Sequence, residues 1–282
     1  MHRLIRLSVT AAAAGLAALT AIAPASASNV SAMHSAKTRG GNGATASSPL
    51  AWNGGPVETT PKVYIDFWGS TWSNYSSAQT YNINFFGNVG GSNWAGIDTQ
   101  YCENAVINTG TCVTNPKGQL KGSYVHNVTL PRRITQSAIA AEAVWAMNNV
   151  FGGYDPNATY FVYTPHGHSM SGFATSWCAW HSSTSSNGNT VAYAYMPYQP
   201  DAGYNCGANS VDGTFDGFSI VGGHEYAEAV TDPHPSSGWT DTSGSEIGDK
   251  CAWVNLSNQN FNGMTFPVQP LYSDAAGGCA VS

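Results

Sequence analysis

Charged side chains are scarce in this chain. They make up 9% of its 282 residues, with 10 Lys and Arg against 16 Asp and Glu, and the formal net charge is −6. A sparse and acidic charge argues against nucleic acid or an anionic membrane as a partner, because both attract basic surfaces. Gly, Ser, Asn, Thr and Tyr must supply the polar surface instead, which is common in secreted, loop-rich proteins.

Two signatures of common enzyme classes are also missing. The sequence contains no Gly-rich phosphate loop and no Gly-x-Ser-x-Gly nucleophile elbow. Nucleotide-dependent enzymes and typical serine hydrolases therefore have no support in this sequence.

Only the N-terminus carries a long apolar run, from Leu7 to Ala23. A basic start precedes it, and the small residues Ala25-Ser26-Ala27 follow it. This order predicts a secretory signal peptide over residues 1–27, and therefore an extracellular protein with no membrane association after cleavage. The rest of the chain keeps 8 basic and all 16 acidic residues, so its formal charge is −8.

The six cysteines are an even number behind a predicted signal peptide, which indicates disulfide bonds. Short loops close most readily. We therefore expect the pairs that are nearest in sequence, Cys102–Cys112, Cys178–Cys206 and Cys251–Cys279.

The remaining chain is long enough for one globular domain, which we place at residues 57–282. Residues 28–56 begin with a stretch rich in Ser, Ala, Gly and Asn, which predicts a disordered linker or a short pro-segment. Strands are predicted at 62–68, 159–164, 172–180, 191–196, 252–256 and 265–268, and helices at 76–86, 136–149 and 215–231. Thr135 is the expected N-cap of the second helix. The interleaving predicts an α+β fold, with mixed α/β as the alternative, that has a central sheet and a motif-bearing helix.

The most specific motif lies within the helix predicted over 215–231. His224-Glu225-x-x-Glu228 is the metallopeptidase His-Glu-x-x-His pattern with Glu in place of the second His. Side chains four residues apart share one helix face, so His224 and Glu228 can bind one metal ion. Glu225 then has the place of a general base for a metal-bound water. The alternative is an amphipathic helix on which His224 and Glu228 form an ordinary hydrogen bond.

Acidic residues gather around this motif, and 8 of the 16 lie between positions 212 and 249. Asp249 and then Glu246 are the expected further metal ligands. One His with several carboxylates suits Zn²⁺, and Ca²⁺ or Mn²⁺ are alternatives. His234 has the spacing of the third His in the extended zincin pattern, but Thr231 stands where that pattern has Gly.

Three other positions are weaker candidates. His168, in His166-Gly167-His168 after a predicted strand, could stabilise an oxyanion, although a polar turn is the favoured interpretation. Asp66 ends a strand and is either functional or a turn cap. Cys178 and His181 resemble a nucleophile pair, but Cys178 is expected in a disulfide.

Three segments together resemble the phosphate-induced, Exordium-like secreted proteins of plants: residues 223–233, Gly238-Trp239-Thr240-Asp241 and Glu246-Ile247-Gly248-Asp249-Lys250-Cys251. The similarity covers roughly residues 57–280 and is strong over 222–251. It implies an extracellular protein, associated with growth responses, whose activity the family name does not define. It also implies a shared polar centre at the positions of His224, Glu225, Glu228, Glu246 and Asp249. In that family the position of Asp232 is usually Asn, and His234 is not part of the pattern.

These observations predict a secreted zinc-dependent hydrolase, most simply a peptidase acting on a peptide, protein or cell-wall substrate. One alternative is a non-catalytic cell-wall or signalling protein with a structural metal or polar centre. Another is a carbohydrate-binding protein that uses exposed Trp and Tyr. The sequence leaves the oligomeric state open.

Overall fold

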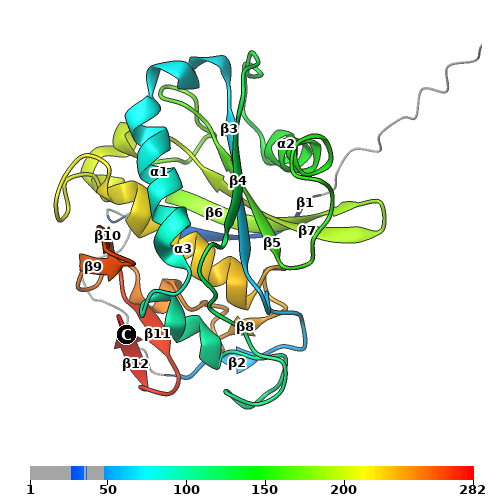
Figure 1. The fold of residues 1–282 in the computed structure, drawn as a ribbon, viewed down its shortest axis with the longest axis vertical. Coiled ribbons are helices and arrows are strands. Elements are labelled where there is room, and N and C mark those ends of the chain that lie inside the picture. The colour runs from blue at the N-terminus through cyan, green and yellow to red at the C-terminus, as the bar shows by residue number, and fades with distance from the viewer. Residues whose placement is uncertain (1–26, 35, 37–47) are drawn as a thin grey trace, which may run out of the picture.

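Six strands form one mixed sheet that organises the fold (Figure 1). The structure is a computed structural model that describes residues 27–34, 36 and 48–282. Nearly all of the predicted signal peptide therefore lies outside the described residues. In the order β1-β6-β7-β5-β3-β4, the last four strands are parallel, and β6 and β1 run antiparallel to their neighbours. The strands are β1 Ala27–His34, β3 Lys62–Trp68, β4 Leu120–His126, β5 Ala158–Tyr163, β6 Trp177–Ser186 and β7 Asn189–Met196.

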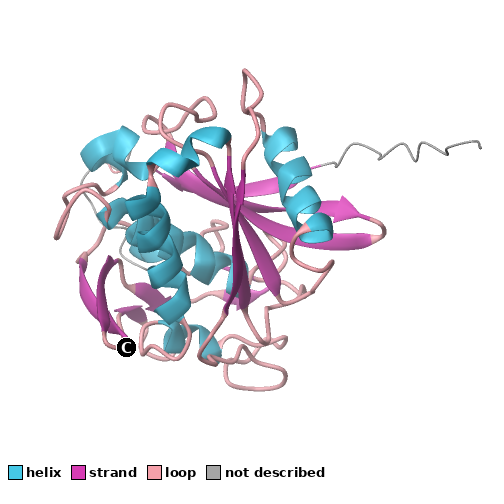
Figure 2. Ribbon diagram, turned by 45° about the horizontal axis from the view of Figure 1, so that its top comes forward, coloured by secondary structure: helices cyan, strands magenta, loops and turns pink. Residues whose placement is uncertain are grey.

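Three helices cover the two faces of this sheet. In Figure 2, α1 and α3 lie on one side and α2 lies on the other. The helices are α1 Ser76–Val89, α2 Gln136–Asn149 and α3 Asp216–Thr231. The predicted combination of helices with a mixed central sheet is therefore confirmed.

Coverage of both faces divides the hydrophobic core into two clusters. Phe161 and Tyr163 on β5 pack in the cluster under α1 and α3, whereas Tyr160 and Val162 pack in the cluster under α2. Successive strand residues point to opposite faces. Every residue of β5 is therefore buried, as expected for a parallel strand covered on both sides.

Helix α2 begins at its predicted N-cap, whereas helix α3 differs from its prediction in its burial. The Thr135 hydroxyl accepts a hydrogen bond of 3.2 Å from the backbone N–H of Ala138, which confirms the predicted N-cap of α2. Helix α3 is different, because all of its residues are buried. The motif helix is therefore not amphipathic but a central helix surrounded by protein.

Short two-stranded sheets and three disulfides complete the fold. The disulfides Cys102–Cys112, Cys178–Cys206 and Cys251–Cys279 are all formed, so the predicted pairing is confirmed. Strand β2 pairs with β8, β10 with β9, and β11 with β12. Their bounds are β2 Ala51–Trp52, β8 Trp239–Thr240, β9 Ser257–Phe261, β10 Met264–Val268, β11 Leu271–Ser273 and β12 Gly278–Ala280. The 3-10 helices are η1 Ser70–Asn74, η2 Ala95–Gln100, η3 Gln199–Cys206 and η4 Asp249–Cys251.

Some predicted elements differ from the structure. Residues 252–256 form no strand, because Trp253 and Asn255 have positive φ values of 63° and 47°, which extended chain does not adopt. Strand β4 lies in a part of the chain where no strand is predicted. Residues 27–34, within or next to the predicted linker or pro-segment, form the edge strand β1. Across the described ranges, no helix is long and apolar enough to cross a membrane.

Candidate metal centre

Helix α3 and the start of η4 bring three predicted ligands together. His224 Nε2 lies 2.9 Å from Glu228 Oε1, one helical turn away, and 3.8 Å from Asp249 Oδ1. The backbone N–H of Asp249 donates to the same Glu228 oxygen at 3.0 Å. One ligand atom from each of the three residues falls within a span of 4.8 Å. The predicted ligands His224, Glu228 and Asp249 therefore converge on one point.

His181 on β6 belongs to the same centre, although the sequence suggested no such role. Its Nδ1 lies 3.4 Å from Glu225 Oε2 and 3.5 Å from Glu228 Oε2, and its Nε2 lies 3.6 Å from Glu246 Oε1. Alternation along β6 places His181 on the α3 side, because Ala179 is in the α3 cluster and Trp180 in the α2 cluster. A histidine at a core-facing position of a buried strand is the signal that could have identified it.

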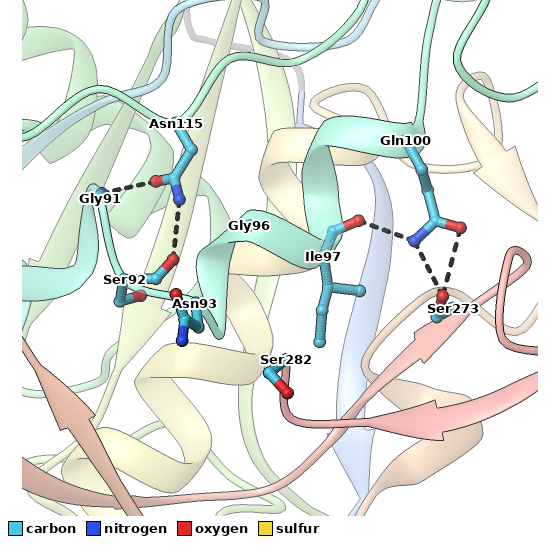
Figure 3. Close-up of a pocket in the computed structure, with 9 residues that line it drawn as sticks. All are labelled: Gly91, Ser92, Asn93, Gly96, Ile97, Gln100, Asn115, Ser273 and Ser282. Carbon is cyan, nitrogen blue, oxygen red and sulfur yellow. Dashed lines mark hydrogen bonds between the residues drawn. The ribbon is translucent and has the colours of Figure 1, made fainter.

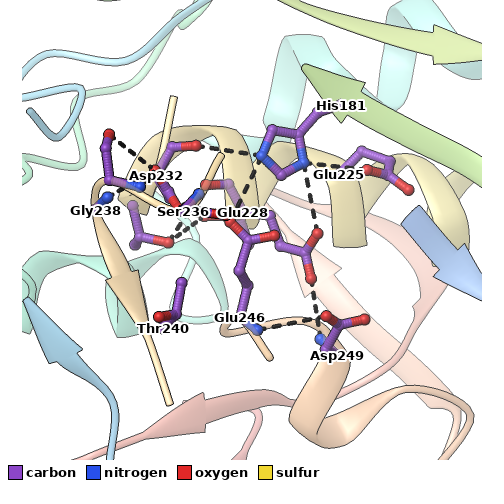
Figure 4. A network of polar contacts seen from close by, with 12 residues as sticks. His181, Glu225, Glu228, Asp232, Ser236, Gly238, Thr240, Glu246 and Asp249 are labelled. Atoms are coloured by element: carbon purple, nitrogen blue, oxygen red, sulfur yellow. Dashed lines mark hydrogen bonds and ion pairs between the residues drawn. The ribbon is translucent and has the colours of Figure 1, made fainter. Parts of the chain in front are cut away.

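Glu228 is shared by two overlapping groups of ligands. Its Oε1 faces His224, and its Oε2 faces His181, as Figure 4 shows in part. The first group is His224, Glu228 and Asp249, and the second is His181, Glu225 and Glu228. The centre thus offers two adjacent ligand sets bridged by one carboxylate.

The residues present fit a divalent cation. His181, His224, Glu225 and Glu228 are 0% exposed and Glu246 is 1% exposed, whereas the Asp249 side chain is 21% exposed. Within the described part of the chain, His181 Nδ1, His224 Nε2, Glu225 Oε2 and Glu228 Oε2 have no hydrogen-bond partner, and neither Glu246 carboxylate oxygen has one. Buried charges are costly unless they are paired or bind a metal. Imidazoles with carboxylates favour Zn²⁺ or Mn²⁺ over Ca²⁺, which prefers oxygen ligands.

The pKa values of the residues in the centre also favour a bound cation. Burial lowers the pKa of His224, but Glu228 beside it raises that pKa to about 9 overall. Burial raises the pKa of Glu225 and of Glu246, and it raises the pKa of Asp249 to about 7. Without a cation, protons therefore neutralise much of this carboxylate cluster. A bound cation would displace those protons, because ligands bind metals in their deprotonated forms.

Outer contacts fix how the two imidazoles present their nitrogens. His224 Nδ1 lies 3.3 Å from Gln269 Oε1, and Gln269 donates from Nε2 to the carbonyl of Gly248 at 2.7 Å. His181 Nε2 lies 3.2 Å from the carbonyl of Asp232. When a cation displaces the second proton of each ring, donation from these nitrogens would leave the lone pairs of His224 Nε2 and His181 Nδ1 directed toward the carboxylates.

The remaining candidates lie outside this centre. His168 is exposed, and its Nδ1 lies 3.0 Å from the carbonyl of His166; no contact with the centre is found for it among the described residues. The Asp232 carboxylate accepts backbone N–H groups of residues 236–238 and so holds the turn after α3. Asp66 forms a separate group with His126 and Glu142 beneath α2.

Comparison of the chain with protein-family models, with curated proteins and with solved structures found no match. The function must therefore be argued from the geometry and chemistry of the centre. Likeness to the Exordium-like proteins rests on the motif residues and stays a prediction.

A pocket of about 430 Å³ lies elsewhere on the surface (Figure 3). Amide and hydroxyl side chains line most of it, and Asn115 and Gln100 are held by hydrogen bonds to neighbouring backbone and side-chain atoms. None of its lining residues belongs to the metal centre. The pocket therefore adds no chemistry to the candidate site.

Proposed function

We propose that the protein is a secreted, metal-dependent hydrolase, most simply a zinc peptidase. One observation carries the proposal: His224, Glu228 and Asp249 converge on one point, where the buried atoms His224 Nε2 and Glu228 Oε2 lack hydrogen-bond partners in the described chain. Three disulfides support an extracellular location, because such bonds persist in oxidising compartments.

The residues of the centre divide into two roles in this proposal. His224, Glu228 and Asp249 would hold the zinc ion, with Glu246 as a further acidic group. Zinc, when bound, would polarise the substrate carbonyl and acidify water. Glu225 would accept the proton of the attacking water and return it to the leaving amine. His181, 3.4 Å from Glu225, would orient that carboxylate. A role for His168 at the oxyanion stays a prediction, since its exposed ring lies outside the centre.

Metal content tests the first half of the proposal. The purified protein, incubated with zinc and passed through a desalting column, should retain one equivalent by elemental analysis, or two if both ligand sets fill. His224→Ala should lose at least one equivalent, because it removes the imidazole from the ligand set formed by His224, Glu228 and Asp249. A folded wild-type protein that retains no metal would remove the hydrolase proposal.

Turnover tests the second half. Glu225→Gln should keep its zinc and lose hydrolysis of a peptide library by a factor of about 10² or more, because general-base catalysis contributes about that much. Glu103→Gln, an exposed position outside the centre, is the matched control and should hydrolyse as the wild type does. Unchanged turnover in Glu225→Gln would contradict the assigned role.

The burial of every residue of the centre except Asp249 favours a second candidate, a structural metal site in a non-catalytic extracellular protein. In that case binding energy is folding energy. Removal of zinc by a chelator should then lower the melting temperature greatly, and no substrate of the library should be cleaved. A catalytic ion can leave with little loss of stability.

A further inference from the structure

Strand β1 covers the metal centre with one face. Met33 is 0% exposed, and its backbone N–H points to Glu225 Oε1 at 3.4 Å. Ser31, two residues earlier, lies near the Glu246 carboxyl group and lowers its pKa slightly against the larger effect of burial. Ala32, between them, packs instead on the α2 side of the sheet. Alternate residues of β1 thus face the centre, as in any strand.

The covering strand pairs with the strand that carries His181. Strand β1 runs antiparallel to β6, and Ser31 stands directly opposite His181, with Met33 opposite Ala179. It is also the edge strand of the sheet, so it lies against only one other strand. At its end, the Trp253 indole N–H donates to the carbonyl of His34 at 2.8 Å.

This arrangement is that of an extended peptide bound to a sheet edge. Without β1, the free edge of β6 would present unpaired N–H and C=O groups, which are a template for another extended chain. The same edge lies beside Glu225 and Glu246, which Met33 and Ser31 of β1 approach.

We propose that β1 is an internal occupant of a peptide-binding site. The free site would bind an extended polypeptide antiparallel to β6, with a small side chain at the place of Ser31 and an apolar side chain at that of Met33. While β1 is in place, the centre is closed. The binding part of this inference stands alone, and the part that concerns turnover rests on the proposed hydrolase function.

Release of β1 in the full chain tests the inference. Met33→Asp puts a carboxylate at a buried position beside Glu225 and should expel the strand. Val30→Asp is the matched control, because Val30 is 40% exposed on the same strand. The probe is a fluorescent peptide with the sequence of residues 27–34, followed by anisotropy. Met33→Asp should bind it at least about tenfold more tightly than wild type or Val30→Asp, since an internal occupant reduces apparent affinity.

A second variant guards against misfolding of the first. Residues 30–34 are replaced by Gly-Ser-Gly-Ser-Gly, which keeps the chain length but removes the side chains that cover the centre. This variant should also bind the peptide, whereas a peptide with Asp in place of its Met should not bind. Failure of both variants to fold, or folded variants that bind no better than wild type, would overturn the inference.

The two proposals fail in different ways. Peptide binding without any cleavage, in a zinc-loaded variant, would support the binding site and remove the hydrolase. Cleavage that is equal in wild type and both variants, with no gain in peptide binding, would keep the hydrolase and remove the internal occupant.

Discussion

Gly248 lies against the two side chains that define the metal centre. A Cβ atom at this position would stand 2.7 Å from His224 Nδ1 and 3.0 Å from Glu228 Oε1. The φ of Gly248 is −77°, so its conformation suits any residue, and only space demands glycine. Packed interiors respond to a single added methyl group. The Glu246-Ile247-Gly248-Asp249 segment therefore needs glycine so that it can approach α3.

Gly248→Ala should destabilise the protein by about 1–3 kcal/mol, the usual cost of overpacking, and weaken zinc binding. Gly278→Ala is the control, because a Cβ there meets no atom within 4 Å. Urea unfolding and a competitive zinc titration measure the two effects. Equal behaviour of the two variants would show that the centre adapts to the extra methyl group.

Asp66 is a buried carboxyl group on the α2 side of the sheet, opposite to the metal centre. It is 1% exposed, and burial, with Glu142 nearby, raises the pKa of Asp66 from its ordinary 3.8 to about 9. In the unfolded chain the same group ionises near pH 4. Between these pH values the unfolded state binds fewer protons, so the free energy of unfolding falls as pH rises.

Asp66→Asn should remove this part of the pH dependence. From pH 5 to pH 8 the variant should lose less stability than wild type, because an amide needs no proton to stay neutral. Urea midpoints at several pH values in that range make the comparison. Parallel curves for the two proteins would mean that Asp66 is ionised in the folded state.

The elements with strong local signals could be predicted from the sequence. Strand β3 and helix α2 have the predicted bounds, and α3 begins one residue later than predicted. Strands β1 and β4 were missed, because their residues are weakly apolar and become strands only through pairing with β6 and β3. The role of His181 was missed because its place beside α3 depends on how β6 packs against that helix. The motif fixed His224 and Glu228, but which strand lies across from a helix is decided by long-range packing.

The two glycines that precede His224 in α3 differ in what surrounds them. A Cβ at Gly222 would meet Met196 at 3.4 Å, an ordinary contact, whereas one at Gly223 would meet Trp94 at 3.2 Å. Trp94 is held by a 2.8 Å hydrogen bond from its indole N–H to the carbonyl of Gln269. Close approach at Gly223 thus connects α3 to the residue that orients His224.

Gly222→Ala should leave stability unchanged or raise it by up to about 1 kcal/mol, because alanine favours helix. Gly223→Ala should instead destabilise, since Trp94 must move against its hydrogen bond. Thermal unfolding of the two variants gives the comparison. A stabilised Gly223→Ala variant would show that Trp94 yields freely.

At the scale of the whole molecule, disulfides close loops of different lengths, and one of them lies beside the metal centre. Cys251–Cys279 closes a separation of 28 residues and lies two residues from Asp249. Cys102–Cys112 closes a separation of only 10. In the chain-entropy view, longer loops contribute more stability.

Replacing Cys251 and Cys279 by Ala should cost about 3–4 kcal/mol of unfolding free energy and weaken zinc binding through Asp249. Replacing Cys102 and Cys112 should cost somewhat less and leave zinc affinity unchanged. Urea unfolding and zinc titration of both double variants separate the effects. Equal zinc affinities in the two would mean that Asp249 is held without the nearby disulfide.

Residues near the C-terminus hydrogen bond with residues near the start of the described chain. Lys250 donates to the carbonyl of Ser48 at 2.7 Å, and the Asp274 carboxylate accepts the backbone N–H of Leu50 at 2.9 Å. Trp253 holds His34 in the same way. A ribosome delivers residues 27–50 long before these partners. During synthesis the early segment therefore lacks these contacts, and the centre closes only after the C-terminal residues have emerged.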